Sequence, residues 1–148
     1  MIGLLMTSKK CVVMRAFGLA LSLVTSAAIA DVVAVVSSKS EFTTLSKSQI
    51  ADIFFGKVGR LSNGLQPVPI DQAEGSAARN EFYLKVADKS AAQMKAYWSK
   101  IVFTGRGQPP QVVRDSAEMK KRIIENLAAV GYIDSDLVDD TVRVVHTQ

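Results

Sequence analysis

Apolar positions recur along residues 32–145 with two periods, that of strands and that of helices. The run VVAVV at 32–36 is apolar throughout, as in a central strand that is covered on both faces. Shorter strand-like segments occur at 112–113, 131–133 and 141–145. The segment LQPVPID at 65–71 also predicts a short strand, at a sheet edge because it contains two prolines.

Helical periodicity predicts four helices between these strands. The first begins at a capping box of Ser46 and Gln49 and ends at Gly56. The second covers about 76–86, with an apolar stripe of Phe82, Tyr83 and Val86.

The third and fourth helices begin with capping boxes as well, Ser90 with Gln93 and Asp115 with Glu118. The spacing of apolar residues predicts a buried face on each helix. These faces comprise Met94, Tyr97, Trp98, Ile101 and Val102 on the third helix, and Met119, Ile123, Ile124 and Leu127 on the fourth.

The resulting order is β, α, β, α, α, β, α, β, β. It predicts one compact three-layer α/β domain, with a mixed sheet flanked by helices. We find no internal repeat and no low-complexity linker in the chain.

Residues 1–30 differ from the rest of the chain. They contain Lys9, Lys10 and Arg15 but no acidic residue, followed by the apolar run AFGLALSLVT and the small-residue exit Ala28-Ile29-Ala30. This pattern is typical of a secretory signal peptide, and the apolar run is too short to span a bilayer. We therefore expect residues 31–148 to be a periplasmic domain without a permanent membrane anchor. Translation from Met14 and a buried N-terminal helix remain as alternatives.

Removal of residues 1–30 changes the charge. The whole chain has 18 Lys and Arg against 14 Asp and Glu, and subtracting the three basic residues of the signal leaves 15 against 14, a net charge of +1. We therefore expect no nucleic-acid partner. The sole cysteine, Cys11, lies in the signal, and the sole histidine is His146. We expect no metal site, no cofactor and no enzymatic activity, since no catalytic motif is present.

The segment DQAEGSAARNEF at 71–82 predicts an anion-binding corner. Gly75 allows close approach of the backbone, Ser76 caps the helix or donates its hydroxyl, and N–H groups of the first turn, at Ala77 and Ala78, are free. Arg79 places a cation where the helix dipole is already positive, which suits a bound anion. The alternative is structural, with Ser76 as an ordinary N-cap and Glu74 as the partner of Arg79.

Ser37 and Ser38 follow the first strand. Ligands of open α/β sheets lie beyond the carboxyl ends of strands. We therefore consider these two serines as second contacts to the same anion, with solvated loop residues as the alternative.

Four segments occur in an order that resembles a known family: IADIFFGK (50–57), PVPIDQAEGSAARNEF (67–82), YWSKIVFTGRGQPP (97–110) and AVGYID (129–134). Together they resemble small phosphate ABC transporter substrate-binding-like proteins, which are related to the periplasmic phosphate-binding protein. The resemblance spans about Val32 to Val145. It implies one lobe of the type II periplasmic-binding-protein fold, with phosphate or a related oxyanion as ligand.

The match to the family's phosphate motif is partial. Ser76 corresponds to the Ser of its Ser-Gly-Thr, whereas Ala77 and Ala78 replace the Gly and Thr, and Gln72 replaces an arginine. The leading hypothesis is a solute-binding-like protein for an oxyanion, serving an ABC transporter. The alternative is a periplasmic interaction or sensory module that has lost anion binding and docks to a permease or an envelope sensor.

Overall fold

The computed structural model describes residues 31–146, and the predicted signal peptide lies outside them. Five strands form one mixed sheet in the order β3-β2-β4-β1-β5. The strands are β1 (Val32–Ser37), β2 (Val68–Gln72), β3 (Gln111–Val113), β4 (Ala129–Asp134) and β5 (Val142–Val144). β2 runs parallel to β3 and β4, and β1 runs antiparallel to β4 and β5.

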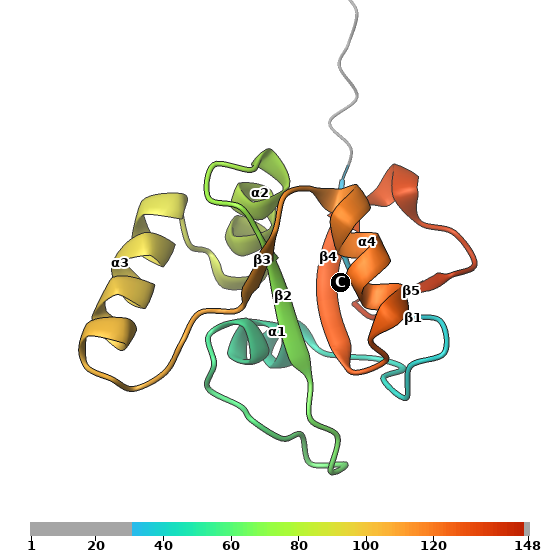
Figure 1. Cartoon of the computed structure of the whole chain (residues 1–148), viewed down its shortest axis with the longest axis horizontal. Coiled ribbons are helices and arrows are strands. Elements are labelled where there is room, and N and C mark those ends of the chain that lie inside the picture. The colour runs from blue at the N-terminus through green and yellow to red at the C-terminus, as the bar shows by residue number, and fades with distance from the viewer. Residues whose placement is uncertain (1–30, 147–148) are drawn as a thin grey trace, which may run out of the picture.

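Four α-helices surround this sheet: α1 (Lys47–Phe54), α2 (Ala77–Ala87), α3 (Ala91–Phe103) and α4 (Ser116–Glu125), with a short 3-10 helix at Ser135–Leu137. α4 packs on one face, and α1 and α2 pack on the other (Figure 1). The predicted order of elements and the three-layer α/β class are therefore confirmed.

The capping signals place the helix starts correctly. The side chains of Ser46 and Ser90 accept hydrogen bonds from the N–H groups of Gln49 and Gln93, and both capping boxes are complete. In the third predicted box, Asp115 caps α4, but the Glu118 carboxylate accepts a bond from the Arg114 N–H instead of closing the box.

The predicted edge position of 65–71 is wrong, because β2 lies between β3 and β4. The ladder with β4 includes Val68 and Pro69, whereas the ladder with β3 begins only at Ile70. Alternate residues of a strand direct their N–H groups to opposite sides. The N–H that Pro69 lacks would therefore point toward β3. Because the pairing with β3 begins only at Ile70, no hydrogen bond between the strands is lost.

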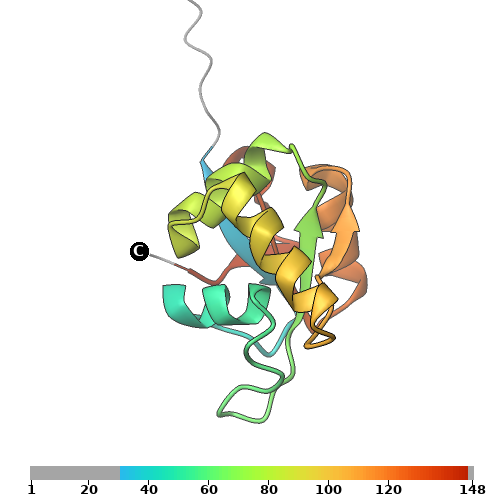
Figure 2. The same ribbon diagram turned by 90° about the vertical axis from the view of Figure 1, so that its left-hand side faces the viewer.

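α3 is less buried than its sequence predicts. Of the five residues of its predicted buried face, only Met94 and Trp98 are buried, and Val102 is 52% exposed. Figure 2 shows α3 at the front, outside the layer formed by α1 and α2. On α4, likewise, Met119 and Ile123 are buried but Ile124 is exposed.

Candidate functional site: the corner between β2 and α2

The predicted anion-binding corner forms where β2 leads into α2. β2 ends at Gln72, and α2 begins at Ala77 with Ser76 as its N-cap. Gly75 has φ of 92° in the turn between them, a conformation that disfavours other residues. The predicted strand, turn and helix start are all present.

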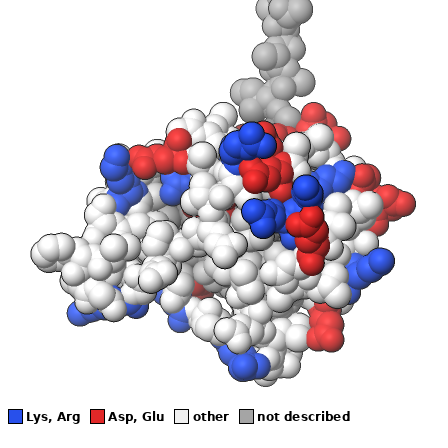
Figure 3. All heavy atoms as spheres, viewed as in Figure 1, with Lys and Arg blue, Asp and Glu red and all other residues white. Residues whose placement is uncertain are grey.

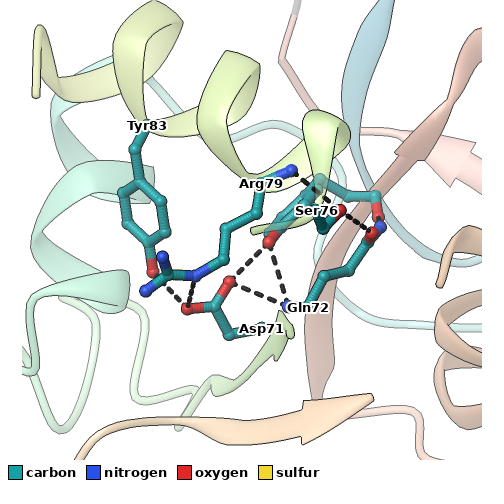
Figure 4. Close-up of polar contacts among 6 residues, drawn as sticks. Asp71, Gln72, Ser76, Arg79 and Tyr83 are labelled. Carbon is teal, nitrogen blue, oxygen red and sulfur yellow. Dashed lines mark hydrogen bonds and ion pairs between the residues drawn. The ribbon is translucent and has the colours of Figure 1, made fainter. Parts of the chain in front are cut away.

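Arg79 does not face the N-terminus of α2. Its side chain runs from the first turn back to the end of β2, where Nε donates to Asp71 Oδ2 at 3.1 Å (Figure 4). The two side chains are only 9% and 4% exposed. The expected orientation of Arg79 toward the start of α2 is therefore wrong, because its charge is paired with a carboxylate inside the protein. Its role as an anion ligand stays a prediction.

The partner of Arg79 is also not the expected one. Glu74, the sequence-based alternative, pairs instead with Lys95 on α3 at 3.1 Å, and both side chains are exposed. An exposed pair of this kind contributes at most about 1 kcal/mol to stability. The internal Asp71–Arg79 pair is the one that shapes the corner.

Further donors fix the Asp71 carboxylate. Tyr83 OH donates to Oδ2 at 2.8 Å, Tyr132 OH donates to Oδ1, and the Gln72 N–H donates to Oδ1 at 2.9 Å. Burial raises the pKa of both tyrosines, and the neighbouring negative charge of Asp71 raises it further. Both hydroxyls therefore keep their protons and remain donors at physiological pH.

The same electrostatics keep Arg79 charged. Burial alone would lower its pKa, but the charge of Asp71 and the hydrogen bond to it outweigh this effect and raise the pKa. The Arg79 Cζ also lies 5.1 Å from the centre of the Tyr83 ring, within the range of a cation–π contact. Asp71, Arg79 and the two tyrosines thus form a buried network in which the charges of Asp71 and Arg79 balance each other.

Ser76 is hydrogen-bonded to residues at both sides of this corner. Its hydroxyl donates to Gln72 Oε1 at 2.7 Å and accepts from the Arg79 N–H at 3.3 Å. Gln72, which stands where the resembling family has an arginine, is buried and donates from Nε2 to Ser116 Oγ at 3.0 Å. Ser76 is an N-cap with both hydrogen-bonding functions in use, as the structural alternative predicts.

Only the backbone at the start of α2 remains available to an anion. Gly75 and Ala77 are exposed, whereas Ala78 is buried. The first N–H groups of a helix have no intrahelical partners and carry the positive end of its dipole. The corner therefore offers a weak backbone anion site without a cationic side chain.

Ser37 and Ser38 lie at the opposite end of the sheet. β2 is parallel to β4, but β1 is antiparallel to β4, so Val32 pairs with Asp134 near the corner. Ser37 is five residues further along β1, roughly 16 Å away. These serines cannot contact the same anion, which corrects the expectation based on strand ends.

The sequence analysis did not identify Asp71 as the partner of Arg79, or Tyr83 and Tyr132 as donors to the Asp71 carboxylate. A signal for Tyr83 was present, because residues four apart on a helix share a face. Asp71 and Tyr132 come from strands that only the tertiary fold brings together. The one polar residue at the end of VPID was the available hint for Asp71.

Two further features concern function. No cluster of three or more His, Cys, Asp or Glu side chains within residues 31–146 is placed to hold a metal ion. Of the helices in this same range, none combines the length and apolarity needed to cross a membrane.

The first turn of α2 also permits a specific prediction. It contains no acidic residue, and Ala77 is exposed. We expect Ala77→Glu to raise the free energy of unfolding by about 0.3–1 kcal/mol, because a carboxylate there complements the helix dipole. Urea denaturation with Ala77→Gln as the uncharged control measures this. Equal stability of the two variants would contradict it.

Comparisons with known proteins identify the fold. No family model matches the sequence, and the search of curated proteins finds no match. Among solved structures, a putative phosphate ABC transporter substrate-binding protein from Clostridium perfringens, with bound phosphate, is similar over 78% of this chain and 44% of its own, at 23% identity and a TM-score of 0.62.

Two other solved structures have the same fold. An ABC-type phosphate transport receptor from Vibrio cholerae matches at 18% identity and a TM-score of 0.58, and PstS from Borrelia burgdorferi at 12% and 0.54. Each match covers 78% of this chain and 45% or 46% of the other. The chain thus has a solute-binding fold and spans less than half the length of these proteins. The descriptions of all three name transport or binding proteins.

Proposed function

We propose that this protein is an exported interaction module: a single solute-binding-type lobe that docks onto another protein of the cell envelope. The observation that supports this proposal most strongly is the buried Asp71–Arg79 pair. It removes from the corner the only cation that the sequence places there, while Ser76 and Gln72 are bonded to each other. A lobe that keeps the fold without free anion ligands is suited to a protein partner.

The partial match to the solved structures bears on the same proposal. The solved phosphate-binding proteins are more than twice as long as the segment they share with this chain. An anion held at a single open corner keeps water on its exposed side, where the higher dielectric weakens charged hydrogen bonds. On this proposal, the described part of the chain gains tight recognition by contact with a protein surface.

A candidate docking face lies at the end of α3 and along β3. We call it the α3–β3 face and define it by Val102, Phe103 and Val112, which are 52%, 92% and 61% exposed. Figure 3 shows much of the surface over α3 free of charge, whereas acidic and basic side chains gather over α4. Exposed aromatic and aliphatic side chains on such a face are typical of the core of a protein interface.

The proposed partner is a permease or sensor with a domain outside the inner membrane. This partner follows from the predicted signal peptide, which would export the domain to the periplasm. We propose that the α3–β3 face contacts a different protein. The competing possibility is contact with a second copy of this chain, and the experiment below distinguishes the two.

Affinity capture from periplasmic and membrane extracts, with the domain as bait, tests this proposal. We expect recovery of an envelope protein, identified by mass spectrometry, and its loss with Phe103→Asp because a charge is placed in an apolar contact. The matched control is Ile124→Asp on α4, which alters an exposed apolar residue on the opposite side of the sheet. Capture that is unaffected by Phe103→Asp, or self-association as the only contact, would count against the proposal.

Binding of phosphate or a related oxyanion, in the service of an ABC transporter, is the second candidate. It is favoured by the exposed start of α2 together with the phosphate-bound structure of similar fold. On this hypothesis the ligands are the backbone N–H groups of Gly75, Ala77 and Ala78, since the Ser76 N–H donates to Ala73 O. The pair of Arg79 with Asp71 holds the first turn of α2 against the end of β2. Binding would be weak, since no free cation lies at the corner.

A further inference from the structure

A groove lies between α3 and the edge of the sheet formed by β2 and β3. Its volume is about 380 Å³, within the range of sites for small molecules. Polar residues from the end of β2 and the start of α2 line one part of it, and Arg79 is among them. The remaining lining combines two polar residues of α3, Lys95 and Ser99, with six apolar residues: Met94, Trp98, Val102, Pro109, Pro110 and Val112.

Two hydrogen-bond donors without partners belong to residues of this groove. Within residues 31–146, the buried side-chain polar atoms that lack a partner are Arg79 Nη1 and Trp98 Nε1. Buried donors are normally satisfied, and an unsatisfied one requires an explanation. Both residues line the same groove, although they come from different helices. Because both residues line one groove, we interpret the two atoms as donors to an acceptor that is supplied from outside the chain.

The charges of the groove define the ligand. Arg79 is compensated by Asp71, and Lys95 at the rim is compensated by Glu74. A charged ligand would leave an unbalanced charge in a largely apolar groove, which is unfavourable. We propose that the groove between α3 and the β2–β3 edge binds an uncharged organic molecule with an apolar body and a carbonyl-type oxygen, which accepts hydrogen bonds from Arg79 Nη1 and Trp98 Nε1.

The proposal requires α3 to move outward before a ligand reaches the two donors, because both donor atoms are covered by protein. Only Met94 and Trp98 of α3 are buried, and the following loop contains Gly105 and Gly107 before Pro109. Few contacts therefore oppose an opening of the groove at this helix.

Trp98 makes the proposal directly measurable, because it is the only tryptophan of the chain. Its indole N–H gives a single resolved signal in a ¹H–¹⁵N correlation spectrum. We use benzamide as the uncharged probe with a carbonyl acceptor, and benzoate as the charged probe of the same shape. We expect benzamide to shift the indole signal saturably at millimolar concentration, and benzoate to bind several-fold more weakly.

Two variants fill the groove from opposite walls. Val112→Phe and Val102→Phe change side chains that are half or more exposed, so we expect both variants to fold, which the dispersion of the same spectrum checks. We expect either variant to abolish the benzamide shift, whereas Val138→Phe, outside the groove, leaves it unchanged. Absence of a saturable shift, an equal shift in the filled variants, or tighter binding of benzoate would each overturn the proposal. If ordered water is the only partner of the two donors, benzamide causes no saturable shift, and the proposal is overturned.

The groove shares Val102 and Val112 with the α3–β3 face, so the two proposals are separated by their readouts and by Phe103. Capture of an envelope protein depends on Phe103, which does not line the groove. Loss of capture with an intact benzamide response, or the reverse, therefore separates failure of one proposal from failure of the other.

Discussion

Replacement of Asp71 by Asn is expected to lower the free energy of unfolding by about 3–5 kcal/mol, because it leaves Arg79 charged, buried and unpaired. The Arg79 side chain is 9% exposed, and within residues 31–146 its ion pair is with this carboxylate alone. Tyr83 and Tyr132 lose their charged acceptor in the same step. Equilibrium denaturation in urea, followed by circular dichroism, measures the loss.

A double variant isolates the charge effect. Asp71→Asn combined with Arg79→Met removes both charges, and we expect it to be more stable than Asp71→Asn alone, since buried pairs are often replaceable by apolar side chains. The exposed counterpart is Glu74→Gln, which breaks the pair with Lys95 and should cost less than about 1 kcal/mol. Equal small losses for Asp71→Asn and Glu74→Gln would show that Arg79 is not held as described.

The second large effect is expected for Phe82→Ala, at about 3–5 kcal/mol of the free energy of unfolding. Phe82 is 1% exposed and stacks on Tyr132 with ring centres 4.0 Å apart and planes at 11°. Its edge-to-face contact with Phe54, at 4.8 Å, ties α2 to α1. The cavity left by truncation would loosen the support on which Asp71 and Arg79 depend.

Phe103→Ala is the matched control for this prediction. It removes the same ring from a side chain that is 92% exposed, and we expect a change within about 0.5 kcal/mol. Thermal and urea unfolding of both variants give the comparison. A small loss for Phe82→Ala, equal to that for Phe103→Ala, would contradict the assignment of Phe82 to the core.

Local signals in the sequence were sufficient for the order of elements. Ser46 and Ser90 mark helix starts by hydrogen bonds that close within one turn, so a single sequence contains all the participants. The position of β2 in the sheet could not be obtained in the same way. The sequence shows that Pro69 cannot donate a backbone hydrogen bond. Whether this affects the pairing with β3 or with β4 depends on the register of β2 with each of them.

The apolar face of α3 illustrates a second limit. The spacing of its residues shows which side of the helix is apolar, but not how much of that side another element covers. Met94 and Trp98 pack against the domain, whereas Val102 extends beyond it. The exposed remainder contributes to the α3–β3 face and to the groove.

The candidate site shows the third limit. The turn, the N-cap and the free backbone of α2 follow from a dozen consecutive residues and were predicted. The direction of Arg79 depends on Asp71 and Tyr132, and the separation of Ser37 from the corner depends on the antiparallel pairing of β1 with β4. Both are consequences of tertiary structure.

The central claim, that Arg79 is withdrawn from the corner and leaves no effective anion site, is tested most directly by thermal unfolding of the domain with phosphate and with sulfate. We expect no stabilisation at millimolar concentrations in the wild type, because a ligand stabilises the folded state only when its concentration exceeds Kd. A saturable rise of Tm with phosphate that persists in Ala77→Gln and is lost in Ala77→Glu would contradict the claim and establish the start of α2 as an oxyanion site.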